Sequence, residues 1–459
     1  MSQSREGLTF LGTPATAPGP LGPQMLRSLL DIRKDPLTYL YRTWRRYGDI
    51  VQFPIPRPPS YLINEPEAVR RVLVTNARNY DKNTIQYRSL SLLTGNGLLV
   101  ASTEDWRRQR PLVQPAFHHE TLQSTTEHVN RAVERLVGEW RRLAAGQVID
   151  MDAAMMHLAL EVVGHALFGM DLSQDASALT RATLEGLDVV VARARVPITP
   201  PAWVPTPGNR RMAAALGQLD RAVLHMLASR RGRPAEGSSD MLDLLINARD
   251  DRGVGLTRRE IRDQIVTFIV AGHETVASAL TWTWALLARS PQVQDLLADE
   301  AAVVLGDRHA GFDDYARLPF ARAVIDEAMR LYPPAWLITR STNEPDVLGG
   351  ADIPAGALLI MSPWLLHRHP QAWSDPWAFD PERFVESETR RVDRSAFIPF
   401  GAGPRQCIGR DFAYVEAVLT LASLAKGFAV SYPGGSMPKA DASVTMRPTG
   451  GLHLRVFSR

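Results

Sequence analysis

The single cysteine of this 459-residue chain, Cys407, stands in a segment whose composition suits metal binding. The segment begins at Phe400, ends at Gly409 and reads Phe-Gly-Ala-Gly-Pro-Arg-Gln-Cys-Ile-Gly. A lone cysteine forms no disulfide within its own chain, so its value lies in packing or in thiolate chemistry. The apolar run that follows predicts a helix, whose positive end would favour the thiolate together with Arg405. We therefore expect Cys407 to bind a soft or borderline metal, with a buried packing role as the alternative.

A second reactive pair, Glu274 and Thr275, lies within a long apolar segment. A carboxyl group and a hydroxyl group that are adjacent can pass protons to a bound reactant. Ala271 and Gly272 precede them, and the missing side chain of the glycine would let a ligand lie against the helix. The alternative is structural, with Thr275 bonded back to a helical carbonyl and Glu274 in a salt bridge.

The helix that carries this pair has a clear beginning. Thr257 and Glu260 form a capping-box pattern, which predicts a helix from there to about Arg289. Such a helix is long enough to cross a membrane, but the polar residues at its centre favour a path through a globular core. His273 gives no zinc motif, because the second histidine of that motif would fall on Ala277.

The remaining pattern predicts a fold that is mainly α with a minor β part. Helical periodicity dominates residues 126–331, and a further helix is expected over 36–47. Short strands are expected at 50–53, 60–63, 358–361, 429–432 and 452–456. We expect residues 1–23 to be a flexible Pro/Gly-rich N-terminus and residues 24–459 to form a single domain.

Composition and charge narrow the class of protein. The net charge is only +3, and no dense run of Lys and Arg points to nucleic acid. The polar N-terminus contains no apolar stretch that would act as a signal or a transmembrane anchor. A cytoplasmic protein is expected, and the single cysteine is consistent with a reducing compartment.

The cysteine segment resembles the haem-ligand loop of the cytochrome P450 family, in its pattern Phe-x-x-Gly-x-Arg-x-Cys-x-Gly. The resemblance implies a haem b cofactor with an axial thiolate from Cys407. It implies that Gly403 and Gly409 let the backbone pass close to the porphyrin and that Arg405 pairs with a haem propionate. It also implies a P450-type fold with a long central helix crossing over the haem.

Further motifs match this family in order along the chain. Trp106 and Arg110 resemble its propionate-binding helix, and Arg340 resembles a further propionate ligand. The resemblance places three more residues in a buried charge cluster that serves folding and haem retention: Glu327, Arg330 and Arg383. In the same family, Thr275 and Glu274 deliver protons during oxygen activation.

The resemblance implies a monooxygenase that uses O2 and electrons from a separate protein. Only 52 residues follow Cys407, too few for a fused reductase, so a ferredoxin or flavodoxin with its reductase is expected. A basic surface of four arginines could dock that partner: Arg107, Arg108, Arg405 and Arg410. A merely solvated arginine face is the alternative.

The substrate is expected to be lipophilic. The candidate pocket residues are Gln86, Tyr87, Val266, Val270, Ala335, Trp336, Leu337, Thr445 and Met446. The motifs around them are similar to those of bacterial carotenoid-ring hydroxylases, with fatty-acid and terpenoid or steroid hydroxylation as competing interpretations. An apolar access segment around Trp203 suggests loose membrane contact during substrate entry. A peroxide-driven enzyme and a non-catalytic haem-thiolate sensor or electron carrier are the remaining alternatives.

Overall fold

The computed structural model describes residues 15–459, except positions 21, 55–58, 118, 171, 173–175, 195–200, 202, 229, 231–239 and 386–394. The described chain is mainly helical with small sheets, as the sequence predicted. Its α-helices are α1 (Gly22–Lys34), α2 (Pro36–Tyr47), α3 (Pro66–Arg70), α4 (Ile85–Thr94), α5 (Thr103–Val113), α6 (His119–Trp140), α7 (Met151–Phe168), α8 (Ala176–Ala194), α9 (Pro207–Ala228), α10 (Met241–Asn247), α11 (Arg258–Leu287), α12 (Pro291–Leu305), α13 (Pro319–Leu331), α14 (Pro363–Leu366) and α15 (Arg410–Gly427).

Short helical segments of other types connect these helices: η1 (Arg71–Thr75), η2 (Ala77–Asn79), η3 (Gln114–Phe117), η4 (Phe312–Arg317), η5 (Pro381–Phe384) and η6 (Gly403–Arg405). The strands are β1 (Ile50–Phe53), β2 (Ser60–Ile63), β3 (Tyr80–Asp81), β4 (Gln147–Asp150), β5 (Ile338–Thr342), β6 (Asp346–Leu348), β7 (Ala351–Ile353), β8 (Leu358–Met361), β9 (Phe428–Ser431), β10 (Ala440–Ala442), β11 (Met446–Pro448) and β12 (His453–Ser458). The predicted strands at 50–53, 60–63 and 358–361 are therefore confirmed at their predicted bounds.

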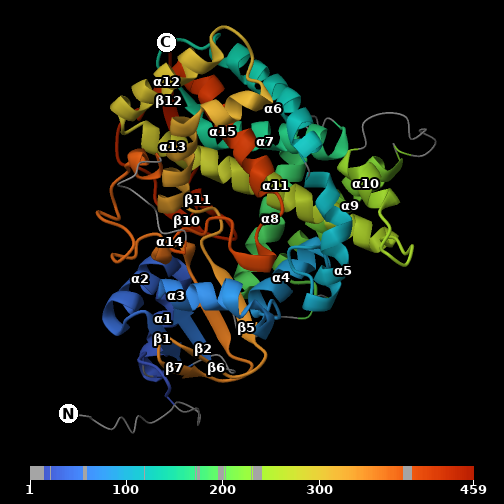
Figure 1. The fold of residues 1–459 in the computed structure, drawn as a ribbon, viewed down its shortest axis with the longest axis vertical. Helices are drawn as coiled ribbons and strands as arrows, with labels where there is room; N and C mark the ends of the chain where they lie inside the picture. Colours follow the sequence, from blue (N-terminus) through green and yellow to red (C-terminus); the bar gives the residue numbers. More distant parts are fainter. Residues whose placement is uncertain are drawn as a thin grey trace.

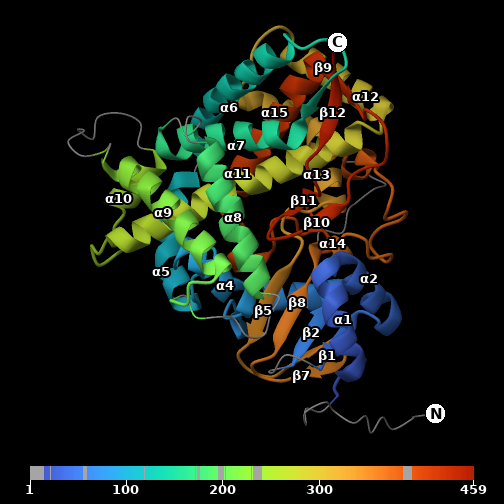
Figure 2. The same ribbon diagram turned by 180° about the vertical axis from the view of Figure 1, so that it is seen from behind.

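The sheets and helices occupy different ends of the molecule (Figure 1). The largest sheet has the order β1-β2-β8-β5-β3 and lies with α1, α2 and α3 at the lower end of Figure 1. β12 pairs antiparallel with both β4 and β9 near the opposite end, and β10 and β11 form a separate hairpin. Figure 2 shows this hairpin between the sheet and the helical layer.

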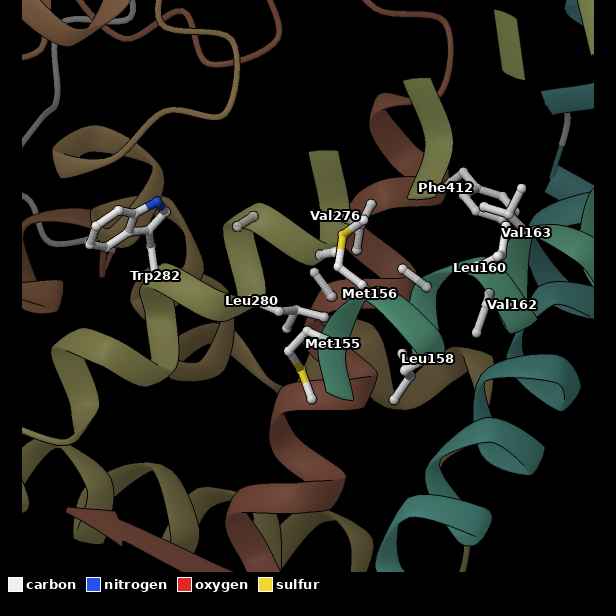
Figure 3. Packing of buried hydrophobic residues seen from close by; sticks show 14 of the residues in the cluster. Met155, Met156, Leu158, Leu160, Val162, Val163, Val276, Leu280, Trp282 and Phe412 are labelled. Atoms are coloured by element: carbon white, nitrogen blue, oxygen red, sulfur yellow. The ribbon is translucent and has the colours of Figure 1, made fainter. Parts of the chain in front are cut away.

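The central helix α11 organises the helical part. Its N-terminus has the predicted capping box, in which the Glu260 backbone N–H donates to Thr257 Oγ1 and the Thr257 N–H donates to Glu260 Oε2. Its main partner is α7, and Figure 3 shows their apolar side chains interdigitated with Phe412 of α15 beside them. Both α7 and α11 are long and apolar enough to cross a membrane, but 78% and 83% of their apolar windows are buried within the fold. Both helices therefore pack as core helices.

The N-terminal segment differs in part from the prediction. Residues 1–14 of the predicted flexible terminus lie outside the described residues. The Thr16 backbone N–H donates to the side chain of Gln52, and Pro18 O accepts from the Gln52 N–H of β1. Helix α1 then begins at Gly22. Residues 15–20 are thus attached to the edge of the main sheet rather than flexible, because β1 offers them backbone and side-chain hydrogen-bonding groups.

A buried charge cluster joins α13 to the segment before the cysteine loop. Arg330 Nε donates to Glu327 Oε2 at 2.6 Å and Nη2 donates to Oε1 at 2.7 Å, and both side chains are completely buried. The remaining donors of Arg330 reach the carbonyl oxygens of His367, Pro376 and Ala378. Arg383 of η5 is the third member, with Nε 3.5 Å from Glu327 Oε1. These charges satisfy one another and the backbone, which is the condition for burying them.

We predict that Glu327→Gln destabilises the protein by about 3–5 kcal/mol, because it leaves Arg330 as a buried charge without a counter-charge. The free energy of unfolding, measured by urea denaturation, tests this. The chain offers a matched control in Glu67 and Arg70, which have the same spacing but are 72% and 47% exposed at the side chain. Glu67→Gln should cost less than about 1 kcal/mol. Equal costs for the two variants would contradict the role assigned to the buried cluster.

Candidate active site

The cysteine loop is a tight turn held against its own chain and against η1. The Cys407 backbone N–H donates to Phe400 O at 3.0 Å, and the Phe400 ring packs on Tyr414 of α15. Gly403 has a φ of +70°, and a Cβ at this position would collide with the carbonyl oxygen of Leu73. A Cβ on Gly409 would lie 3.4 Å from the Phe117 ring. Gly403 therefore permits close packing of the loop on η1, whereas a Cβ on Gly409 would make an ordinary contact.

The Cys407 side chain is solvent-accessible. Burial by the surrounding protein is nevertheless the main cause that raises the pKa of its thiol above the usual value. The Gly409 N–H, Arg110, Lys82 and Arg410 oppose the increase in pKa only in part. The Gly409 N–H and these cations act in the direction that the sequence predicted, toward the thiolate, but in the metal-free protein they do not outweigh desolvation.

Four cations lie near this loop without a carboxylate partner. They are Lys82, Arg110, Arg340 and Arg405, and among the described residues none of them forms an ion pair with Asp or Glu. Lys82 donates to Leu99 O and Arg110 donates to Gln406 O. Arg340 donates to Thr339 O and Tyr87 Oη, and Arg405 donates to Ala101 O and Thr103 Oγ1. Burial and the neighbouring Arg340, Arg405 and Arg110 hold the pKa of Lys82 well below its usual range. This cluster of positive charge favours an anion.

The structure brings the sequence-predicted arginines together and adds a residue that sequence reasoning missed. The Arg405 guanidinium lies 4.5 Å from the centre of the Trp106 ring, so α5 and the cysteine loop meet there. Lys82 Nζ lies 4.8 Å from the centre of the Tyr87 ring. The sequence around Lys82, between Asp81 and Asn83, gives no indication that this lysine belongs to a cluster of cations. Only the fold shows that it lies beside three arginines.

A short strip of α11 is accessible in the middle of a buried helix. From Asp263 to Leu287 every residue is buried except Ala271, Gly272 and Thr275. Positions i, i+1 and i+4 lie on one face, so this face opens on an internal space. Thr275 Oγ1 donates to Ala271 O at 2.7 Å, as the structural alternative proposed. A Cβ on Gly272 would lie 3.1 Å from Val163 Cγ2 of α7, so the glycine also allows close packing of the two helices.

The adjacent Glu274 is buried and not in a salt bridge, contrary to the structural alternative for this residue. Its side chain is 3% exposed, and Oε1 accepts a 2.7 Å hydrogen bond from Thr445 Oγ1. Burial raises the pKa of Glu274 to about 7. The neighbouring His273 is fully buried, and burial lowers its pKa to about 4. Among the described residues, no group of three or more His, Cys, Asp or Glu could hold a metal ion.

The predicted pocket residues divide into two groups. Gln86, Tyr87 and Leu337 are partly accessible and Ala335 is exposed. The other five predicted residues are buried: Val266, Val270, Trp336, Thr445 and Met446. Trp336 Nε1 donates to Ser443 O, and Met446 O accepts two side-chain hydrogen bonds from α11, so these residues build the wall behind the surface.

The predicted basic docking surface is not supported. Arg108 pairs with Glu260, and Arg410 Nε lies 2.8 Å from Asp411 Oδ1. Arg405 stacks on Trp106 inside the site, which leaves Arg107 as the one of the four that is exposed without such a contact. Carboxylates thus offset the charge of Arg108 and Arg410, and stacking on Trp106 directs Arg405 into the site, which reduces the positive surface that the sequence suggested.

The comparisons agree with this geometry. The sequence model of the cytochrome P450 family matches residues 18–455. The chain therefore belongs to the cytochrome P450 family of haem-thiolate monooxygenases. It is 38% identical to cyclooctatin synthase of Streptomyces melanosporofaciens, over 94% of each chain. It is 35% identical to cyclooctat-9-en-7-ol 5-monooxygenase of the same organism, over 90% of this chain and 88% of the relative. Pentalenene oxygenase of Streptomyces avermitilis is 33% identical, over 90% of this chain and 91% of its own.

The residues present fit the haem of this family. Cys407 is the only cysteine of the chain, so the axial thiolate comes from it. A coordinating thiol loses its proton to the metal, which overcomes the raised pKa of the free thiol. Haem carries two propionates, and a cluster of positive charge such as that of Lys82 and three arginines suits anions of this kind. The family also establishes an oxidoreductase that acts with O2, a lipophilic substrate and a redox partner, which sets aside the non-catalytic sensor or electron carrier.

We predict that Glu274 makes stability depend on pH. Its ordinary pKa of 4.5 is raised to about 7, so its contribution to stability is complete below pH 4.5 and is lost as the pH rises through 7. Glu274→Gln removes this effect, so the free energy of unfolding of the variant relative to wild type should increase by about 3 kcal/mol between pH 4.5 and 8. Urea denaturation across this range measures the difference. A difference that stays constant with pH would contradict the burial of an ionisable Glu274.

Proposed function

We propose that the chain hydroxylates a terpenoid. The observation that carries the proposal is the accessible strip of Ala271, Gly272 and Thr275 on an otherwise buried helix, because it offers a small, mostly apolar surface with one hydroxyl group. The names of the relatives support the substrate class, since two of them name cyclooctat-9-en-7-ol and pentalenene. Carotenoid-ring hydroxylation is the second candidate and rests on the similarity of the sequence motifs; carotenoids are themselves long terpenoids.

The roles of the individual residues follow from their contacts. When bound, the haem supplies the iron centre at which dioxygen is reduced and one oxygen atom is inserted into a C–H bond. Cys407 would hold the iron, and four cations would hold the propionates: Lys82, Arg110, Arg340 and Arg405. The Trp106 ring would keep Arg405 in place. Ala335 and Leu337 would contact the substrate, since both are accessible.

Proton supply would come from α11. Thr275 is partly accessible, so its hydroxyl can exchange its bond to Ala271 O for one to a bound water or reactant. Glu274 is adjacent, and its raised pKa of about 7 lets it hold and release a proton near neutral pH. A protein driven by peroxide alone has no need of this pair, so the O2-dependent reaction is favoured.

The proposed partners are those that the sequence suggested, except for the surface on which the electron donor would dock. A separate ferredoxin or flavodoxin with its reductase would supply electrons, but docking would not depend on the four arginines first considered. Trp203, immediately before α9, is 83% exposed and would suit a loose contact with a membrane that stores the substrate. A cytoplasmic location accords with the burial of both α7 and α11.

An optical titration of the ferric haem protein tests the substrate class. We expect saturable low-spin to high-spin shifts of the Soret band with terpene hydrocarbons or terpene alcohols, because a ligand that fills the pocket displaces water from the iron. Medium- and long-chain fatty acids and a carotenoid are titrated in parallel. A shift with fatty acids and none with any terpenoid would overturn the proposal.

The proton-delivery role predicts a specific defect. Thr275→Ala should retain haem and lower product formation by about tenfold or more, with the reducing equivalents appearing as hydrogen peroxide. Thr283→Ala is the matched control, since Thr283 Oγ1 makes the same 2.7 Å bond to Ala279 O in the same helix but is fully buried. Unchanged coupling of electrons to product in Thr275→Ala would contradict the role.

A further inference from the structure

Within the residues that the structure describes, the Glu274 carboxyl group has one hydrogen-bond partner, which comes from the β10–β11 hairpin. Thr445, at the end of the hairpin turn, donates from Oγ1 to Glu274 Oε1 at 2.7 Å. Glu274 Oε2 is buried and has no hydrogen-bond partner within the described part of the chain. The two side chains are 3% and 6% exposed, so the carboxyl group cannot turn freely toward bulk solvent. One oxygen is therefore engaged and the other is available.

The hairpin is attached to α11 independently of this contact. Met446 O accepts from Ser278 Oγ at 2.7 Å and from Trp282 Nε1 at 2.8 Å, and the Met446 N–H donates to Pro334 O at 3.0 Å. The next residue, Arg447, pairs with Asp152 of α7. The residues that follow Thr445 are thus held by contacts with α11, Pro334 and α7. Removing the Thr445 hydroxyl should therefore leave the hairpin in place.

Charged groups surround Glu274 without touching it. Arg447 of β11 favours its ionised form, whereas Asp152 of α7 and Asp188 of α8 oppose it. None of these three forms an ion pair with Glu274 within the described part of the chain. Of the groups that the structure describes, the Thr445 hydroxyl is therefore the one that stabilises the carboxylate by direct contact, and its bond also decides which oxygen remains available.

We propose that Thr445 is a positioning residue that holds Glu274 Oε1, so that Oε2 is the oxygen that takes up and releases the proton. This inference rests on the proposed role of Glu274 in proton delivery. It assigns Thr445 to proton supply rather than to the substrate-contacting surface suggested by the sequence. It also makes the C-terminal hairpin, 38 residues beyond Cys407 in the sequence, a part of the catalytic machinery.

The test compares Thr445→Val with two controls. Valine keeps the shape of threonine and removes the hydroxyl, whereas Thr445→Ser keeps the hydroxyl. Ser278→Ala removes a hydrogen bond that attaches the same hairpin to α11 but does not contact Glu274. Infrared spectroscopy of the ferric holoprotein measures the band of the protonated Glu274 carboxyl group across pH, with Glu274→Gln to assign the band. Electron-to-product coupling is measured across the same pH range.

We expect the infrared midpoint of Thr445→Val to lie about one pH unit above that of wild type, because a hydrogen bond to the carboxylate form is lost. The midpoints of Thr445→Ser and Ser278→Ala should match wild type. The basic limb of the coupling profile should move upward with the midpoint in Thr445→Val, because Glu274 keeps its proton to higher pH, and coupling at its best pH should fall several-fold.

Two outcomes separate the inference from the function on which it rests. A Thr445→Val midpoint equal to that of wild type, or one matched by Ser278→Ala, would overturn the positioning role, because the hydroxyl would then have no specific effect on Glu274. Full coupling in Glu274→Gln would instead overturn the proton-delivery role of Glu274, whatever the infrared midpoints of the Thr445 variants.

Discussion

The burial of α11 against α7 is the constraint on which the rest of the structure depends. Interdigitated apolar side chains fix this helix pair, and Figure 3 shows Met155 and Met156 of α7 beside Leu280 and Val276 of α11. Other elements are then positioned on α11. The loop before α5 attaches through Asn96 N–H to Asp263 and Leu98 N–H to Gln264, and the C-terminal hairpin attaches through Ser278 and Trp282. A small shift of α11 would therefore displace residues on several sides of the site.

Buried charge is handled in two different ways in this protein. Glu327 and Arg330 satisfy each other within the chain, so their burial serves folding. Lys82 and its three arginine neighbours have no carboxylate partner within the described residues, so a bound anion would relieve their mutual repulsion. Under the proposed propionate-binding role, cofactor binding would also stabilise the fold, because a ligand that binds only the folded state stabilises it.

Several residues that were expected to meet the substrate instead hold the pocket together. The Trp336 side chain donates a hydrogen bond to the β10–β11 hairpin, and the Met446 carbonyl oxygen of that hairpin accepts one from α11. Thr445 of the same hairpin contacts Glu274. The accessible surface is left to small or partly exposed residues such as Ala271, Thr275 and Ala335. Buried residues thus hold the segments behind this accessible surface together.

The sequence by itself determined the family, the helical fold class, the axial cysteine and the capping box of the central helix. These features depend on local patterns, namely the spacing around Cys407, the Thr257–Glu260 pair and the apolar periodicity. Only the tertiary structure decided that Lys82 joins the arginine cluster, that Arg108 and Arg410 are neutralised by carboxylates, and that Thr445 holds Glu274. Desolvation and contacts between distant segments control these features, and neither can be inferred from the spacing of neighbouring residues.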